Sequence, residues 1–201
     1  MPANTNAALD RLVDALGRLP GVGAKSAERL AHHILKAPAE EALALAEAIR
    51  GAKQDVGTCT LCFHLTEADQ PLCAICRDAR RDKGLLCVVE TSRDLLAVEK
   101  SGTYVGVYHV LGRFAPLQGY NVDQLTLEAL ADRVGEGGIR ELILATNPNL
   151  EGDGAAMLVA ARLENAGVTI SRLARGLASG SSLEFANKEM LADALAGRRA
   201  F

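Results

Sequence analysis

The chain has 201 residues, of which 49% are hydrophobic and 23% are charged, an ordinary balance for a globular protein that can bury its own core. With 22 Lys and Arg against 25 Asp and Glu, the net charge of −3 excludes a general positive field for nucleic acid, so any such contact needs a local patch. Aromatic residues make up only 3% and Trp is absent, which argues against a row of base-stacking platforms. No apolar run approaches the roughly 18 residues of a membrane span, and no signal peptide is visible. We therefore expect a cytoplasmic protein.

Residues 1–57 are predicted to be helical throughout. Apolar residues recur at helical spacing in a first helix, and a second helix repeats the period after the break at residues 20–23. The residues that carry the two stripes are Leu9, Leu12, Val13 and Leu16, then Ala27, Leu30, Ala31, Ile34 and Leu35. Pro38 opens a third helix, because proline is tolerated at a helix start, and this helix is expected to reach about Gln54.

The break between the first two helices reads Leu-Pro-Gly-Val-Gly-Ala-Lys-Ser-Ala, at residues 19–27. Gly21 and Gly23 permit a tight hairpin whose backbone N–H groups, at the start of the next helix, favour a phosphate. Four basic side chains then share one face of that helix, and we call them the basic ridge: Lys25, Arg29, His32 and Lys36. The pattern predicts sequence-independent contact with the DNA backbone through Gly21, Gly23, Lys25 and Arg29, as in helix–hairpin–helix motifs. The alternative is a plain turn between packed helices.

Four of the five cysteines form two Cys-x2-Cys pairs separated by ten residues: Cys59, Cys62, Cys73 and Cys76. Two such pairs complete a tetrahedral sulfur site suited to one structural zinc ion per chain, with no open position for catalysis. His64 lies among them and is interpreted as a bystander, while Cys87 fits the core of a strand. The alternative is a redox pair or a coincidence of spacing. Residues 58–84, which we call the cysteine module, are too polar to fold without metal.

From residue 85 onward, short apolar strands alternate with helical stretches. The strands are predicted at 85–90, 105–111, 141–145 and 169–173, and the helices near 92–100, 123–134, 154–166 and 186–198. This alternation predicts an α/β fold with a mostly parallel sheet and flanking helices. We therefore expect four parts: a helical region at 1–57, the cysteine module at 58–84, an α/β domain at 85–178 and a C-terminal helical segment at 179–201.

Acidic residues follow two of the predicted strands: Glu90 and Asp94 after the first, and Glu151 and Asp153 after the third. Parallel sheets place their sites at the carboxyl ends of strands, and if these strands are neighbours, Glu90, Glu151 and Asp153 would converge and could hold Mg²⁺. The pattern resembles the Toprim domain of topoisomerases, primases and related nucleases. The alternative is that the acids cap helices and complement helix dipoles.

A helix–hairpin–helix, a four-cysteine module and a Toprim-like domain, in this order, resemble the bacterial RecR family over nearly the whole chain. The most specific stretches are residues 19–31, the cysteine block, 87–90, 108–112, 145–153 and 172–176. The resemblance implies a DNA-binding recombination mediator of the RecF repair pathway that is not an enzyme. It implies a ring-like tetrameric clamp that acts with RecO, and in some members RecF, to load the RecA recombinase onto gapped or single-stranded DNA at the bacterial nucleoid. We expect the acids Glu90, Asp94, Glu151 and Asp153 to form a partner-docking patch.

Two segments depart from the family pattern. Asn187 stands where the family usually has an Asp, and the loop at residues 113–120 lacks the usual glycine-rich form. An enzymatic alternative is a Mg²⁺-dependent Toprim nuclease or primase-like protein that uses Glu90, Glu151 and Asp153. A third alternative is a zinc-dependent adaptor that never touches DNA.

Overall fold

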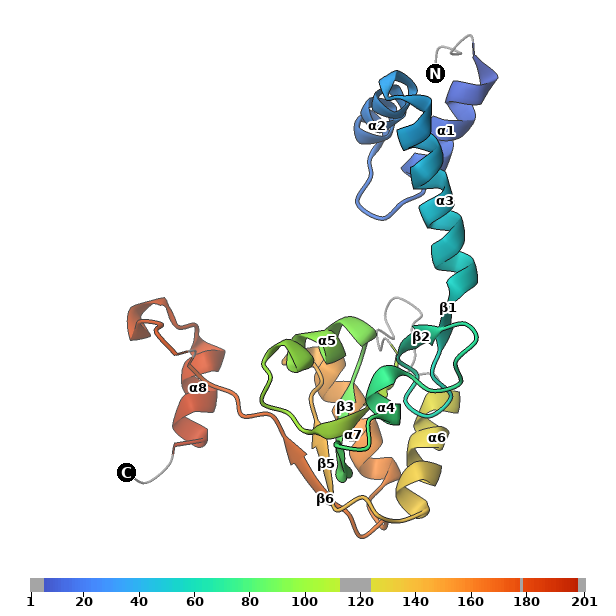
Figure 1. Ribbon diagram of the computed structural model, residues 1–201. Helices are drawn as coiled ribbons and strands as arrows, with labels where there is room; N and C mark the ends of the chain where they lie inside the picture. The colour runs from blue at the N-terminus through green and yellow to red at the C-terminus, as the bar shows by residue number, and fades with distance from the viewer. Residues whose placement is uncertain (1–5, 113–123, 178, 199–201) are drawn as a thin grey trace. The chain divides into compact units, whose positions relative to one another are not determined.

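The computed structural model describes residues 6–112, 124–177 and 179–198. The chain forms two compact units, Met1–Val56 and Gly57–Phe201 (Figure 1). Within the described ranges, no helix is long and apolar enough to cross a membrane. The loop at 113–120, whose sequence departs from the family pattern, lies outside these ranges.

The first unit consists of the three predicted helices, α1 (Ala7–Gly17), α2 (Ala24–Lys36) and α3 (Ala39–Asp55). Asn6 is the N-cap of α1, and its side chain accepts hydrogen bonds from the first free N–H groups of the helix. The helices α1 and α2 pack together, and Ala27 and Ala31 are the buried residues of α2. Of the apolar stripe predicted on α2, the small residues Ala27 and Ala31 are buried, Ile34 is half-buried, and Leu30 and Leu35 are exposed.

The cysteine module is built from short elements. Strands β1 (Val56–Thr58) and β2 (Leu65–Glu67) form a two-stranded sheet, and a single helical turn, α4 (Ala74–Arg77), follows. All four cysteines of the two pairs are buried and form a cluster of their own, against which Leu72 and Ile75 pack. The chain then runs directly into the main sheet, with no linker.

The main sheet has four parallel strands in the order β4-β3-β5-β6: β3 (Asp82–Val89), β4 (Gly106–Val110), β5 (Glu141–Leu144) and β6 (Thr169–Arg172). Cys87 of the central strand β3 lies opposite Tyr108 of β4 and Ile143 of β5. The predicted parallel sheet is confirmed, and the neighbouring strands β3 and β5 are those followed by the acidic residues.

Helices cover both faces of this sheet. Leu86 and Val88 of β3 pack on the side of α6 (Gln124–Gly135) and α7 (Leu150–Arg162). Cys87 and Val89 belong to the opposite core, with α5 (Ser92–Lys100). Successive residues of a strand point to opposite faces, so the uninterrupted apolar run of β3 is explained by burial on both sides.

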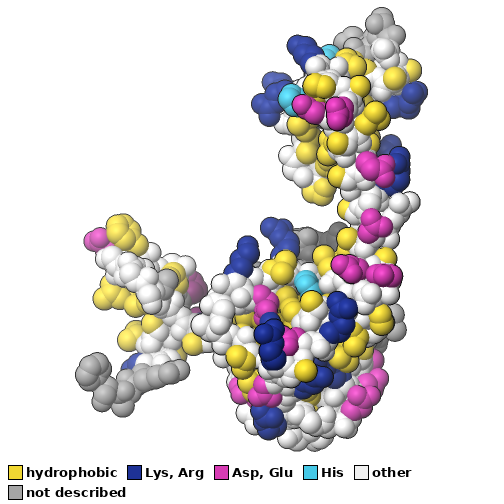
Figure 2. Space-filling view, in the orientation of Figure 1, with side chains coloured by type: hydrophobic (Ala, Val, Ile, Leu, Met, Phe, Trp, Pro, Cys, Tyr) yellow, Lys and Arg dark blue, Asp and Glu magenta, His cyan; other side chains and the backbone are white. Residues whose placement is uncertain are grey.

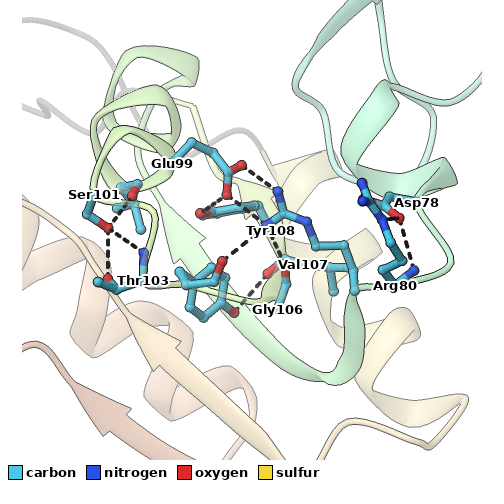
Figure 3. Close-up of polar contacts among 11 residues, drawn as sticks. Asp78, Arg80, Glu99, Ser101, Thr103, Gly106, Val107 and Tyr108 are labelled. Carbon is cyan, nitrogen blue, oxygen red and sulfur yellow. Dashed lines mark hydrogen bonds and ion pairs between the residues drawn. The ribbon is translucent and has the colours of Figure 1, made fainter.

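A polar network ties the end of the cysteine module to the sheet (Figure 3). The two amino groups of Arg81 bind the Glu99 carboxylate of α5, at 2.8 and 2.5 Å, and one of them also lies 3.2 Å from the Gly106 carbonyl. The Tyr108 hydroxyl donates to Glu99 at 2.5 Å, and the Tyr104 hydroxyl donates to two main-chain carbonyls. The network joins α5, the start of β3 and the edge strand β4.

The outer edge of β4 is occupied by hydrogen-bond partners at every second residue. Besides the Gly106 carbonyl, the Tyr108 carbonyl accepts from Arg133 of α6 at 2.7 Å. The Val110 N–H donates to the Cys62 carbonyl of the cysteine module at 2.8 Å. An open strand edge invites pairing with another chain, so these partners protect the sheet on the β4 side.

The C-terminal segment contains a short 3-10 turn, η2 (Leu183–Phe185), and α8 (Lys188–Ala196). Asn187 precedes α8, and its side-chain oxygen accepts from the Met190 N–H at 2.8 Å. The residue that stands where an Asp is usual therefore serves as an N-cap, which an Asp would do equally well.

Candidate functional site

The hairpin between α1 and α2 turns at Gly21, whose φ of +80° lies in the left-handed region that favours glycine. The Val22 N–H donates to the Leu19 carbonyl at 3.0 Å and closes the turn. Gly23 is the N-cap residue of α2 and offers no side chain to cap the helix. The first N–H groups of α2 therefore remain available to an external acceptor.

The basic ridge lies on the exposed face of α2. Its four side chains, Lys25, Arg29, His32 and Lys36, are all exposed, on the side away from the buried Ala27 and Ala31. Basic and histidine side chains gather around α2 in the N-terminal unit (Figure 2). The hairpin, the helix start and these cations thus belong to one continuous surface of the first unit.

The four cysteine sulfurs lie within 4.8 Å of one another, and those of Cys62 and Cys73 are 3.6 Å apart. A tetrahedral site with zinc–sulfur bonds of about 2.3 Å places its sulfurs about 3.8 Å apart, so the donor set fits a zinc ion. The four cysteines are free rather than disulfide-bonded, and the group does not include His64. The predicted pairs therefore come together as one closed set of four soft ligands.

A hydrogen bond links two of the four thiols. The hydrogen bond between Cys62 and Cys73 holds the pKa of the Cys62 thiol above its ordinary value and that of Cys73 below it, since one sulfur keeps the proton that the other shares. Without a cation, burial opposes having several thiolates side by side. A bound metal ion would supply the charge that allows all four to ionise.

Glu90 and Asp94 lie at the carboxyl end of β3 in different roles. Glu90 is only 5% exposed, and its carboxylate accepts from the main-chain N–H and the side-chain amide of Asn147, at 2.7 and 3.0 Å. Asp94 belongs to a capping box, in which its carboxylate accepts from the N–H and hydroxyl of Thr91. Glu90 thus joins the ends of β3 and β5, whereas Asp94 stabilises the start of α5.

Asp153 is bound by two arginines from the end of β6 and the segment after it, Arg172 and Arg175. The hydrogen bond from Arg175, together with that from Arg172, holds the pKa of this carboxyl below its ordinary value. The helix α7 begins at Leu150 rather than near residue 154, because the Asn149 side chain accepts from the Gly152 N–H. Glu151 and Asp153 therefore lie on the first turn of a helix and point to different surroundings.

Glu90, Asp94 and Glu151 line the same hollow of about 560 Å³, together with Thr91, Arg93, Asn147 and Asn149. Asp153 is not part of its lining. In the ranges that the structure describes, the four cysteines are the only group of three or more Cys, His, Asp or Glu side chains close enough to share a metal ion. The acids are thus gathered at one end of the sheet, but Glu90, Glu151 and Asp153 do not converge on one point.

Together these parts define a helix–hairpin–helix protein with a Toprim domain and an intervening four-cysteine centre. Residues 9–53 match the family model described as "RecR, helix-hairpin-helix", and residues 84–174 match that of the Toprim domain. Proteins called Recombination protein RecR are similar along nearly their whole length. One from Rhodopirellula baltica is 53% identical over 96% of each chain, and one from Myxococcus xanthus is 48% identical over 95% of this chain and 96% of its own. The chain belongs to the RecR family.

Proposed function

We propose that the protein is a DNA-binding recombination mediator of the RecF repair pathway and acts without catalysing a reaction on DNA. The observation that carries this proposal is the surface of the first unit, where an uncapped helix start and four exposed basic side chains flank the Gly21 hairpin. That unit is also the one matched by the RecR helix–hairpin–helix model, and the relatives are recombination proteins by name.

The chemistry of this surface suits the phosphate backbone rather than base edges. Main-chain N–H groups at the start of α2, near Gly21 and Gly23, would donate to phosphate oxygens, and the helix dipole favours the negative charge. Lys25 and Arg29 would add two ionic contacts on the adjacent turns. Such contacts carry no sequence information, so binding should be independent of sequence.

The cysteine module is proposed to hold one structural zinc ion through Cys59, Cys62, Cys73 and Cys76. The support is the donor set itself, four buried sulfurs within 4.8 Å of one another. When bound, zinc supplies the cross-link that a segment with so small an apolar cluster lacks. The four ligands complete the tetrahedral coordination of the ion, so no position stays open for catalysis and the role of the site is structural.

The acidic hollow is proposed to receive a protein partner. RecO is the expected partner, with RecF in some members, and the protein is expected to form a ring-like tetramer that helps load RecA onto gapped or single-stranded DNA at the nucleoid. Glu90 and Glu151 line an open hollow, and a basic partner surface would neutralise their charge, whereas DNA would be repelled. Glu90, Asp94 and Asp153 contribute less than Glu151, because internal partners already bind their carboxylates. The same internal partners argue against the nuclease alternative, because a Mg²⁺-dependent nuclease needs several carboxylates that are free to bind the ion.

The test of DNA binding replaces both ridge residues, Lys25→Ala and Arg29→Ala, in the full chain. Each lost phosphate contact should lower the slope of log affinity against log salt by roughly one, so the double variant should lose about two units of slope. Its affinity should fall alike for unrelated sequences. Binding is measured by fluorescence anisotropy with labelled single-stranded and gapped DNA at several salt concentrations.

Lys53→Ala is the matched control, because this exposed lysine lies on α3, outside the ridge. A double variant that folds and binds with the parent's affinity and salt slope would contradict the proposed interface. Incubating the wild-type protein with the same DNA and Mg²⁺ or Mn²⁺ tests the nuclease alternative, and cleavage that Glu90→Gln abolishes would establish that alternative instead.

A further inference from the structure

Arg133 of α6 is a half-buried arginine with an unusual set of neighbours. Its Nη1 donates to the Tyr108 carbonyl oxygen at 2.7 Å, an acceptor that carries no charge. Among the ion pairs of the described residues, none involves Arg133. A guanidinium removed from water without a carboxylate needs another source of negative charge.

The geometry of the β4 edge places that guanidinium beside the cysteine module. Arg133 binds the edge at Tyr108, and Cys62 binds the same edge at Val110, two residues further along. Successive outward-facing positions of a strand lie about 7 Å apart. The module's helix α4 also packs against β4. The arginine and a metal-ligand residue therefore occupy adjacent sites on one strand.

The charges of the two groups are complementary. Burial lowers the pKa of Arg133, and the negative charge of the Cys76, Cys62 and Cys59 thiolates opposes this effect. A zinc ion with four thiolates carries a net charge of −2, and a buried centre of that charge is stabilised by a nearby cation. Arg133, bound to the same strand edge as Cys62, supplies such a cation from the sheet side.

We infer that Arg133 is a positioning residue that compensates the charge of the four-cysteine metal centre from outside its ligand set. This inference rests on the proposed metal site. Residues beyond the direct ligands tune metal affinity by their charge and hydrogen bonds. Arg133 would in this way make metal retention depend on α6, an element outside the cysteine module that binds the same edge of β4.

Two variants separate charge from hydrogen bonding. Arg133→Lys keeps the positive charge, and Arg133→Gln keeps a donor for the Tyr108 carbonyl but is neutral. If charge compensation is the role, the Gln variant should bind zinc roughly 10- to 100-fold more weakly than the wild type, and the Lys variant should remain close to it. Arg162→Gln is the matched control, because this exposed arginine of α7 pairs with Glu128, which lies on α6 as Arg133 does.

Zinc affinity is measured by competition with a chromophoric chelator on the full-length protein, and zinc content by elemental analysis. Circular dichroism of each variant loaded with zinc shows that it is folded. Equal affinities of the Gln variant and the wild type would overturn the role of Arg133 while leaving the metal site intact. A weakened Lys variant beside an unaffected Gln variant would assign Arg133 to edge hydrogen bonding alone. A wild-type protein without stoichiometric zinc would overturn the metal site and the inference together.

Discussion

Glu99 accepts three hydrogen bonds, two from Arg81 and one from the Tyr108 hydroxyl, and only 23% of its side chain is exposed (Figure 3). The hydrogen bond with Arg81 holds the pKa of Glu99 below its ordinary value. Burial and the bond to Glu99 raise the pKa of Tyr108. Because ionised hydrogen bonds shielded from water are stronger than exposed pairs, this carboxylate should contribute measurably to the stability of the second unit.

We expect Glu99→Gln to lower the free energy of unfolding by about 1.5 to 3 kcal/mol at pH 7, the usual contribution of a hydrogen bond to a charged group. A carboxyl with a lowered pKa stabilises the fold at all pH values above its unfolded pKa of about 4.3, and the contribution is lost only as the pH falls through the folded value. The difference between variant and wild type should therefore be the same at pH 6 and pH 8.

Urea unfolding followed by tyrosine fluorescence reports on this unit alone, because the chain has no Trp and all three tyrosines lie beyond residue 56. Glu128→Gln is the comparison, because it breaks the exposed pair with Arg162 and should leave unfolding unchanged. A Glu99 variant as stable as the wild type, or a difference that varies between pH 6 and 8, would show that the network contributes little.

At the scale of elements, the spacing of apolar residues is sufficient to predict the three N-terminal helices and the four strands of the main sheet. The strands are recognisable because burial on both faces of the sheet leaves uninterrupted apolar runs. The helix starts were harder. Thr91 and Asp94 form a capping box, and Asn149 caps α7, so three of the four acids singled out, Asp94, Glu151 and Asp153, lie in first turns. The spacings Thr-x-x-Asp and Asn-x-x-Gly carry this signal in the sequence.

The long-range pairs could not be predicted from one sequence. The bonds of Asp153 to Arg172 and Arg175, and of Arg81 to Glu99, join residues 18 or more positions apart. Which charges meet depends on strand order, and neither composition nor periodicity specifies the order β4-β3-β5-β6. The four cysteines were predictable because their spacing alone limits them to one compact cluster.

Removing the metal should loosen β4 before the rest of the sheet. The Cys62 carbonyl accepts from Val110, and the Phe63 ring lies edge-on to His109 with ring centroids 5.3 Å apart, so a disordered module would withdraw both contacts from the strand. We expect Cys73→Ser to lower zinc content from one per chain and to speed amide hydrogen exchange in residues 106–110. Exchange in β5 should change less, because β5 lies between β3 and β6.

Cys87→Ser is the matched control for that prediction. Cys87 is buried in the sheet core, outside the four-cysteine cluster, and burial raises the pKa of its thiol to about 12. This variant should keep its zinc, which elemental analysis would show. Full zinc occupancy in the Cys73 variant, or loss of zinc without faster exchange in β4, would contradict the link between metal and edge.

For the whole molecule, the net charge of −3 conceals an uneven distribution of charged residues between the two units. The exposed cations of the ridge belong to the first unit, and the acidic hollow belongs to the second. We expect Glu151→Lys to weaken the binding of RecO while leaving DNA affinity unchanged or slightly raised. The double variant of Lys25 and Arg29 should show the reverse pattern.

Both interactions can be measured on the same samples, RecO binding by calorimetry and DNA binding by anisotropy. Glu164→Lys reverses the charge of another exposed acid in the second unit, outside the hollow, and should affect neither. If Glu151→Lys and Glu164→Lys weakened RecO binding equally, the effect would reflect overall charge and not docking at the hollow.

Because the chain is synthesised from its N-terminus, the contacts at the outer edge of β4 form in a fixed order. The ribosome releases residues 59–76 before residues 106–110, so the cysteine module can be folded when β4 emerges. The helix α6, which carries Arg133, and the strand β5 emerge later. During that interval the nascent sheet consists of β3 and β4 alone, and the module is the main cover of its outer side. Zinc supply at the time of translation, more than in the finished protein, would then decide whether the new strand pairs with its own chain or with a neighbouring one.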